Sequence, residues 1–225
     1  LDSGDYELEI DADEDGDSDN VGTLVLEERS TDSLAIWTAP QGETIANTDD
    51  VTEAIEDGNL TQQSDLAEGD LLVHQFQASG LEGSLNAQEN EEVTEEFFAA
   101  VEGDAVAVTI NQSNPGPNRE ALALALGPEN TTVIADGDND TYFVIVETAD
   151  VEGVREDGGT EKISPLDLDN REYTANVTVL ENGLAEDDET VTADFELVDD
   201  ALDFDNDPVN VSNAEAQTVS GTTSI

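Results

Sequence analysis

The side chains of this chain that could do chemistry are almost all carboxylates. Its 225 residues include 57 Asp and Glu, a single histidine and no cysteine. The lack of cysteine excludes disulfides, thiolate nucleophiles and thiolate metal sites. One histidine leaves Ser-His and multi-histidine zinc sites impossible or incomplete. That residue, His74, shares a side of the predicted strand 71–78 with Leu72 and Phe76. We therefore interpret it as a partly buried strand residue and not as a general base.

Carboxylates alone can catalyse one familiar reaction, the hydrolysis of glycosides by a pair of acids. With 57 acidic residues, however, no pair can be singled out. A glycine-rich phosphate loop is also missing from the sequence. The sequence therefore predicts a protein that is not an enzyme and requires no cofactor.

Three acidic turns could bind calcium. The first matches the start of a calcium loop, with oxygen ligands at alternate positions and a glycine at the sixth, but its twelfth position is Gly22 instead of a bidentate glutamate. Because short Asp-x-Asp runs arise by accident in so acidic a chain, two hypotheses stay open, specific Ca²⁺ sites or solvated turns that hold cations loosely. The candidate metal ligands are Asp11, Asp13, Asp15 and Asp19 in the first turn and Asp136, Asp138 and Asp140 in the second, with Asp203, Asp205 and Asp207 in a third turn.

Six Asn-x-Ser/Thr sequons indicate N-glycosylation, at Asn59, Asn111, Asn130, Asn139, Asn176 and Asn210. One of them can be placed on a predicted strand, 171–180. There the alternation turns Tyr173 and Val177 inward, so that Asn176 and Thr178 share the outward face. A glycan at Asn176 would therefore meet solvent.

The net charge of −52 has three interpretations. Intrinsic disorder conflicts with the alternating strand patterns along most of the chain. An acidic mimic of nucleic acid, or a partner for a basic protein, should carry its charge in blocks, whereas here it is spread over nearly every turn. Adaptation to molar salt, where the Debye length falls to ~3 Å, fits best because only one residue, Lys162, is a lysine. Without a basic patch, binding to nucleic acid is not expected.

The predicted fold is all-β, a sandwich or barrel of about ten strands with two short helices at 48–57 and 91–101. The strand 142–146 is apolar on both faces, which predicts a central strand. The segment 121–126 alternates Ala and Leu and fits a strand by its period. We expect a single extracellular β-rich domain over 1–225, with two lobes at 1–112 and 119–225 as the alternative. No transmembrane run is visible.

Several segments together resemble a domain of haloarchaeal secreted surface glycoproteins of the S-layer type. The resemblance covers roughly residues 1–200. The segments that carry it are 26–32 (LEERSTD) running into 36–40 (IWTAP), 71–75 (LLVHQ), 78–83 (ASGLEG), 111–118 (NQSNPGPN), 133–136 (VIAD) and 142–144 (YFV). The resemblance implies β-rich, N-glycosylated modules that assemble into a cell-surface lattice or filament.

These observations lead to one expected function and one alternative. We expect a structural protein of the cell surface of an extreme halophile, secreted and self-assembling with copies of itself into an S-layer lattice or an extracellular filament. The alternative is a cell-surface adhesin or binding module that recognises a glycan or a protein through its loops. Terminal strands, at 1–10 or near Val219, would be the candidates for exchange between filament subunits.

Overall fold

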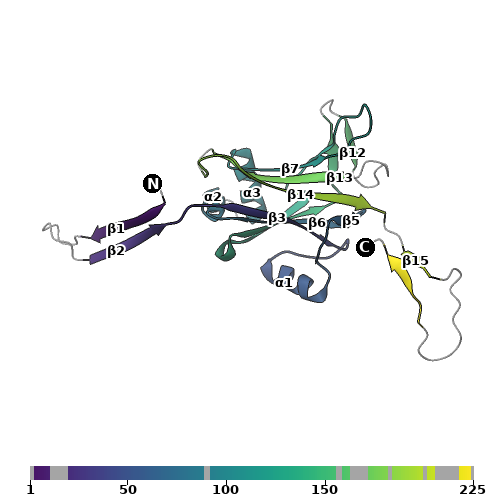
Figure 1. Ribbon diagram of the computed structural model, residues 1–225, viewed down its shortest axis with the longest axis horizontal. Coiled ribbons are helices and arrows are strands. Elements are labelled where there is room, and N and C mark those ends of the chain that lie inside the picture. Colours follow the sequence, from purple (N-terminus) through teal and green to yellow (C-terminus); the bar gives the residue numbers. More distant parts are fainter. Residues whose placement is uncertain are drawn as a thin grey trace. The chain divides into compact units, whose positions relative to one another are not determined.

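The computed structural model describes residues 3–10, 20–88, 92–155, 159–162, 172–181, 184–199, 202–205 and 218–223 (Figure 1). The chain forms two compact units, Leu1–Ser30 and Thr31–Ile225. The expected single domain over 1–225, and its alternative of two lobes at 1–112 and 119–225, stay predictions. The predicted all-β class is confirmed, because most of the described elements are strands in sheets that pack as a sandwich.

The first unit is a β-hairpin. Its strands β1 (Gly4–Ile10) and β2 (Asn20–Leu26) pair antiparallel over their full length. The sequence Asp-Tyr-Glu-Leu-Glu-Ile within β1 alternates between acidic and apolar or aromatic residues, which is typical of a strand with two unlike faces.

The second unit contains the sandwich, which is built from a five-stranded and a seven-stranded sheet. The five-stranded sheet is antiparallel throughout. In spatial order its strands are β4 (Thr61–Gln62), β3 (Thr31–Ala39), β6 (Leu71–Ala78), β10 (Thr141–Glu147) and β9 (Thr131–Asp136).

The seven-stranded sheet forms the other layer. Its pairs are antiparallel except for that of β14 with β5, which is parallel. Its order is β12 (Thr160–Lys162), β11 (Glu152–Val154), β8 (Ala123–Leu124), β7 (Val106–Gln112), β13 (Glu172–Val179), β14 (Glu189–Val198) and β5 (Asp65–Ala67). A separate antiparallel pair joins β15 (Leu202–Phe204) to β16 (Gly221–Thr223).

Strand β10 is buried on both faces, as its sequence predicts. Tyr142, Val144 and Val146 point into the main core, which the two sheets share. Phe143 and Ile145 point the other way, into a smaller cluster with α1 (Thr48–Asp57). The five-stranded sheet is therefore covered on both faces, by the second sheet and by a helix.

The helices differ from the prediction in number and in detail. The N-cap of α1 is Asn47, whose side chain accepts the Asp50 N–H at 3.0 Å. Helix α3 (Val93–Glu102) begins two residues later than predicted. A third helix, α2 (Leu81–Asn86), was not predicted; it is only six residues long and buries Leu81 and Leu85, four residues apart.

Candidate functional site

His74 offers no catalytic chemistry in this fold. Its side chain is fully buried in the sandwich, where the sequence had indicated partial burial. Burial lowers the pKa of His74 from 6.5 to about 4, because desolvation disfavours the charged imidazolium. A buried, neutral imidazole cannot exchange protons with a substrate in solvent. Within the described part of the chain, no three His, Asp or Glu side chains are placed to hold a metal ion.

The acidic turn between β9 and β10 is a short 3-10 turn, η1 (Gly137–Asn139), followed by Asp140 in the left-handed region at φ 49°. Asp136 uses one carboxylate oxygen to accept the Asn139 side-chain N–H at 2.8 Å. The turn thus does not gather Asp136, Asp138 and Asp140 into one three-ligand cluster. Calcium at this turn stays a prediction. Residues Asp11, Asp13, Asp15, Asp19 and Asp207 lie outside the described residues.

The outward face of β7, β13 and β14 carries a cluster of hydroxyl and amide side chains, with Glu172, Asp194 and Glu196 at one end. We call it the hydroxyl face, and it is formed by Thr109 and Asn111 of β7, Thr174, Asn176 and Thr178 of β13, and Thr190 and Thr192 of β14. Each of these side chains is exposed or half-buried. The alternating inward residues of the same strands, such as Tyr173 and Val177, fill the core.

Side-chain hydrogen bonds join the three strands across the hydroxyl face. The hydroxyls of Thr178 and Thr190 lie 2.8 Å apart, and Asn176 donates to the Thr109 hydroxyl at 3.4 Å. At one end of the face, the Thr174 hydroxyl donates to the carboxylate of Asp194 at 2.6 Å. Such cross-strand pairs stabilise a sheet and hold its outward side chains in place.

Two sequon asparagines meet on the hydroxyl face. In the register of β7 and β13, Asn111 lies opposite Thr174, and Asn176 lies opposite Thr109. They are therefore diagonal neighbours on one surface. The outward placement of Asn176 and Thr178, predicted from alternation, is confirmed. The sequence had given no reason to place Asn111 beside them, because only the strand register brings the two together.

The other described sequons lie in turns. Asn59 is exposed just after the α1 C-cap and donates to Glu43 at 3.3 Å. Asn139 is exposed in η1. Asn130 differs from both, since it is only 7% exposed. Asn210 lies outside the described residues.

Asn130 has a structural role that uses its whole amide. Its Nδ2 donates to the Ala125 carbonyl at 2.9 Å, and its Oδ1 accepts the Gly127 N–H and the Thr131 hydroxyl, each at 3.0 Å. These bonds hold the turn that leads into β9. A glycan would replace one of the two hydrogens on Nδ2 of a side chain that is only 7% exposed, so burial disfavours modification in the folded structure.

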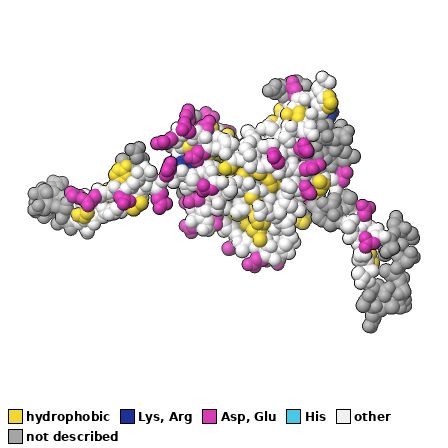
Figure 2. All heavy atoms as spheres, viewed as in Figure 1, with side chains coloured by type: hydrophobic (Ala, Val, Ile, Leu, Met, Phe, Trp, Pro, Cys, Tyr) yellow, Lys and Arg dark blue, Asp and Glu magenta, His cyan; other side chains and the backbone are white. Residues whose placement is uncertain are grey.

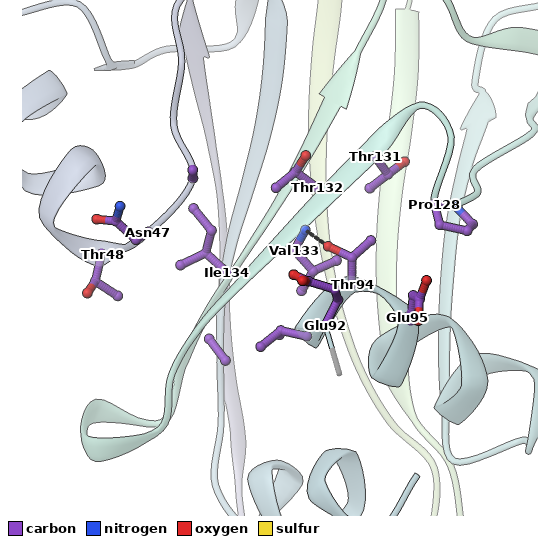
Figure 3. Close-up of a pocket in the computed structure, with 13 residues that line it drawn as sticks. Asn47, Thr48, Glu92, Thr94, Glu95, Pro128, Thr131, Thr132, Val133 and Ile134 are labelled. Atoms are coloured by element: carbon purple, nitrogen blue, oxygen red, sulfur yellow. Dashed lines mark hydrogen bonds between the residues drawn. The ribbon is translucent and has the colours of Figure 1, made fainter. Parts of the chain in front are cut away.

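A hollow of about 540 Å³ opens beside β9, the edge strand of the five-stranded sheet (Figure 3). The N-terminal ends of α1 and α3 form its walls, with Asn47 and Thr48 on one side and Glu92 and Glu95 on the other. The Val133 N–H donates to the Thr94 hydroxyl at 2.9 Å, which satisfies one donor of this edge. The lining is mainly threonine, alanine and branched aliphatic side chains, and its acidic residues are Glu92 and Glu95.

Carboxylates are spread over the visible face of the molecule, with few cationic side chains among them (Figure 2). This distribution is the one that adaptation to molar salt predicts. No helix among the described residues is long and apolar enough to cross a membrane.

Comparison with known proteins identifies relatives over the whole chain. The sequence is 46% identical, over 228 aligned residues, to a cell surface glycoprotein of Haloferax gibbonsii. It is 34% and 32% identical to cell surface glycoproteins 1 and 2 of Haloarcula hispanica, with 100% and 92% of the chain aligned. No family model and no solved structure matches the chain.

The chain spans about a quarter of the length of each of these relatives, between 24% and 26%. The predicted resemblance to haloarchaeal surface glycoproteins is confirmed by identity over the entire chain, and with it the predicted location at the cell surface. The chain therefore belongs to the haloarchaeal cell surface glycoproteins.

Proposed function

We propose that this chain is a structural module of the haloarchaeal cell surface that associates with copies of itself into an S-layer lattice or an extracellular filament. The observation that carries the proposal is the match of the complete chain to cell surface glycoproteins. The composition supports a mechanical role, since the chain has no cysteine and its single histidine is buried in the core.

The chemistry of the surface supports this role in three ways. A carboxylate coat stays hydrated in molar salt, where repulsion between neighbouring charges is screened. Divalent cations such as Ca²⁺ can bridge carboxylates of facing copies, because hard cations prefer oxygen ligands. Glycans on the exposed sequon asparagines would keep the remaining surface solvated. On the hydroxyl face, Asn111 and Asn176 would carry such glycans side by side.

Self-association can be tested with the purified chain in molar NaCl, with and without added Ca²⁺. We expect light scattering to report particles larger than one chain and negative-stain microscopy to show sheets or filaments. Single particles that remain monomeric and bind to cells would contradict this proposal and support the adhesin alternative. A dependence of assembly on Ca²⁺ would support bridging of carboxylates by the cation.

A further inference from the structure

We propose that the β1–β2 hairpin binds the same hairpin of a second copy, face to face around a two-fold axis. The proposal rests on the self-association proposed above and names the surface that carries it. That surface, which we call the apolar face, is the side of the hairpin formed by Gly4, Tyr6, Leu8 and Ile10 of β1 and Asn20, Gly22, Leu24 and Leu26 of β2.

The two faces of the hairpin differ in charge, although the charged face also carries the exposed side chains of Val21 and Val25. Alternation along β1 puts Tyr6, Leu8 and Ile10 on the apolar face and all three acidic residues of the strand on the other. The register then pairs these acids with the remaining residues of β2, as Asp5 with Val25, Glu7 with Thr23 and Glu9 with Val21. The apolar face therefore has eight residues and no charge.

The apolar face is largely open within the hairpin. Ile10 is 60% exposed, Leu8 50% and Leu24 38%. A single two-stranded hairpin is at best marginally stable in water, and exposed apolar side chains of this size commonly mark an interaction site. A covering surface would therefore stabilise the hairpin by removing these side chains from water.

The lack of charge on the apolar face indicates that a second copy of the hairpin binds there. Each chain carries a net charge of −52, so most contacts between copies bring carboxylates together. Two apolar faces can meet without placing any carboxylate between them. The acids of β1, Asp5, Glu7 and Glu9, then remain on the outside of the pair, where they stay hydrated.

The shape of the apolar face complements itself. Across the two strands, Leu8 lies opposite Gly22 and Leu26 lies opposite Gly4, so each leucine stands beside a hollow. The space above both glycines is open, because a Cβ built on either one meets no atom within 4 Å.

A two-fold axis parallel to the strands would lay β1 of one copy over β2 of the other. Leu8 then enters the hollow at Gly22 of the second copy. Leu26 likewise enters the hollow at Gly4 of the second copy, and Tyr6 contacts Leu24 of that copy. An axis across the strands would put Leu24 over Gly22 instead. In either arrangement Gly22 receives a leucine, which makes this glycine the position that tests the proposal.

The test compares Gly22→Val with a matched control, Thr23→Val. Gly22 has an ordinary strand backbone, since its φ is not among the positive values. Valine favours strands and would meet nothing in a single hairpin. In the proposed pair it would fill the hollow that a leucine needs. Thr23→Val adds a valine to the same strand on the opposite face.

We would measure association of the full chain and both variants by sedimentation velocity in molar NaCl, and check their folding by circular dichroism. Overpacking costs about 1–3 kcal/mol per site, so Gly22→Val should weaken association about fivefold or more. Thr23→Val should associate like the unmodified chain. Leu8→Ser, which removes the side chain instead of filling the hollow, should also weaken association.

The outcomes separate the two proposals. If the unmodified chain associates and Gly22→Val and Leu8→Ser associate equally well, the assignment to the hairpin is overturned while self-association stands. If the unmodified chain remains monomeric at every concentration, both proposals fail. Loss of association in both Thr23→Val and Gly22→Val would also overturn the assignment, because the loss would then not depend on which face of the hairpin is changed.

Discussion

His74 and Phe195 meet edge-on across the core of the sandwich, with ring centroids 6.4 Å apart and planes inclined by 68°. His74 comes from β6 of the five-stranded sheet and Phe195 from β14 of the seven-stranded sheet. Phe195 in turn stacks on Tyr173, with centroids 5.4 Å apart. The one imidazole of the protein is thus part of the contact between the two layers, and it must be neutral to remain there.

We expect the free energy of unfolding to fall as the pH drops from 6.5 toward 4 because of His74. Burial lowers the pKa of His74 to about 4, whereas the unfolded chain takes up a proton near pH 6.5. The unfolded state therefore binds more protons within this window, and the stability that is complete above pH 6.5 is lost as the pH falls. The expected loss at the acid end is about 3 kcal/mol.

The variant His74→Leu isolates this effect from the titration of surface carboxylates. Thermal melts of both proteins in molar NaCl, across the same pH window, should show a smaller decrease in Tm for the variant at acid pH. Equal pH dependence of the two proteins would show that the buried imidazole does not contribute.

Low salt should unfold the domain. At a net charge of −52, repulsion is screened when the Debye length is ~3 Å in molar salt, and it returns when the length grows to ~30 Å at 0.01 M. Dialysis followed by far-ultraviolet circular dichroism should show loss of the β signal. A spectrum that is the same in molar and millimolar salt would contradict the salt-adapted interpretation.

Replacing Asn130 should destabilise the protein more than replacing another sequon asparagine. Asn130→Ala removes three hydrogen bonds in a buried turn and leaves the Gly127 N–H and the Ala125 carbonyl without these partners. We expect a loss of about 1–3 kcal/mol in the free energy of unfolding. The control Asn139→Ala, in an exposed turn, should change it by much less. Denaturant titration in molar salt measures both.

Glycan occupancy should follow exposure. On native material, glycopeptide mass spectrometry should find modification among Asn59, Asn111, Asn139 and Asn176 and none at Asn130, whose side chain is buried. A glycan at Asn130 would show that modification precedes folding or that this turn rearranges. An intact mass equal to that of the bare chain would contradict glycosylation altogether.

Strands were predictable from the sequence where burial of one face produces alternation or burial of both faces produces an apolar run. Strands β1, β6, β10 and β13 were predicted closely, because alternation or a doubly apolar run records burial directly. The segment 121–126 was predicted as a strand, yet only Ala123–Leu124 pairs, since its alternating Ala and Leu carry little propensity for a sheet. The short helix α2 gave no recognisable signal, because six residues span less than two turns.

The surface features depended on register, which the sequence does not specify. The outward position of Asn176 follows from alternation within one strand. Asn176 lies next to Asn111 only because β13 pairs with β7, and these strands are about sixty residues apart in the chain. The open hollows at Gly4 and Gly22 are likewise visible only once the two strands are aligned.

The parallel pairing of β5 with β14 has a consequence for how the chain reaches its fold. Leu66 lies beside Leu197, so residues near the first third of the chain complete a sheet only with residues close to the end. Folding therefore waits for a contact of long sequence separation, and such topologies fold slowly. Until β14 forms, β5 and the free edge of β13 lack a partner strand, and such edges are prone to aggregation. The dense negative charge of the chain would keep partly folded molecules apart until this contact forms. The same acidic composition would thus hydrate the folded surface and limit aggregation during folding.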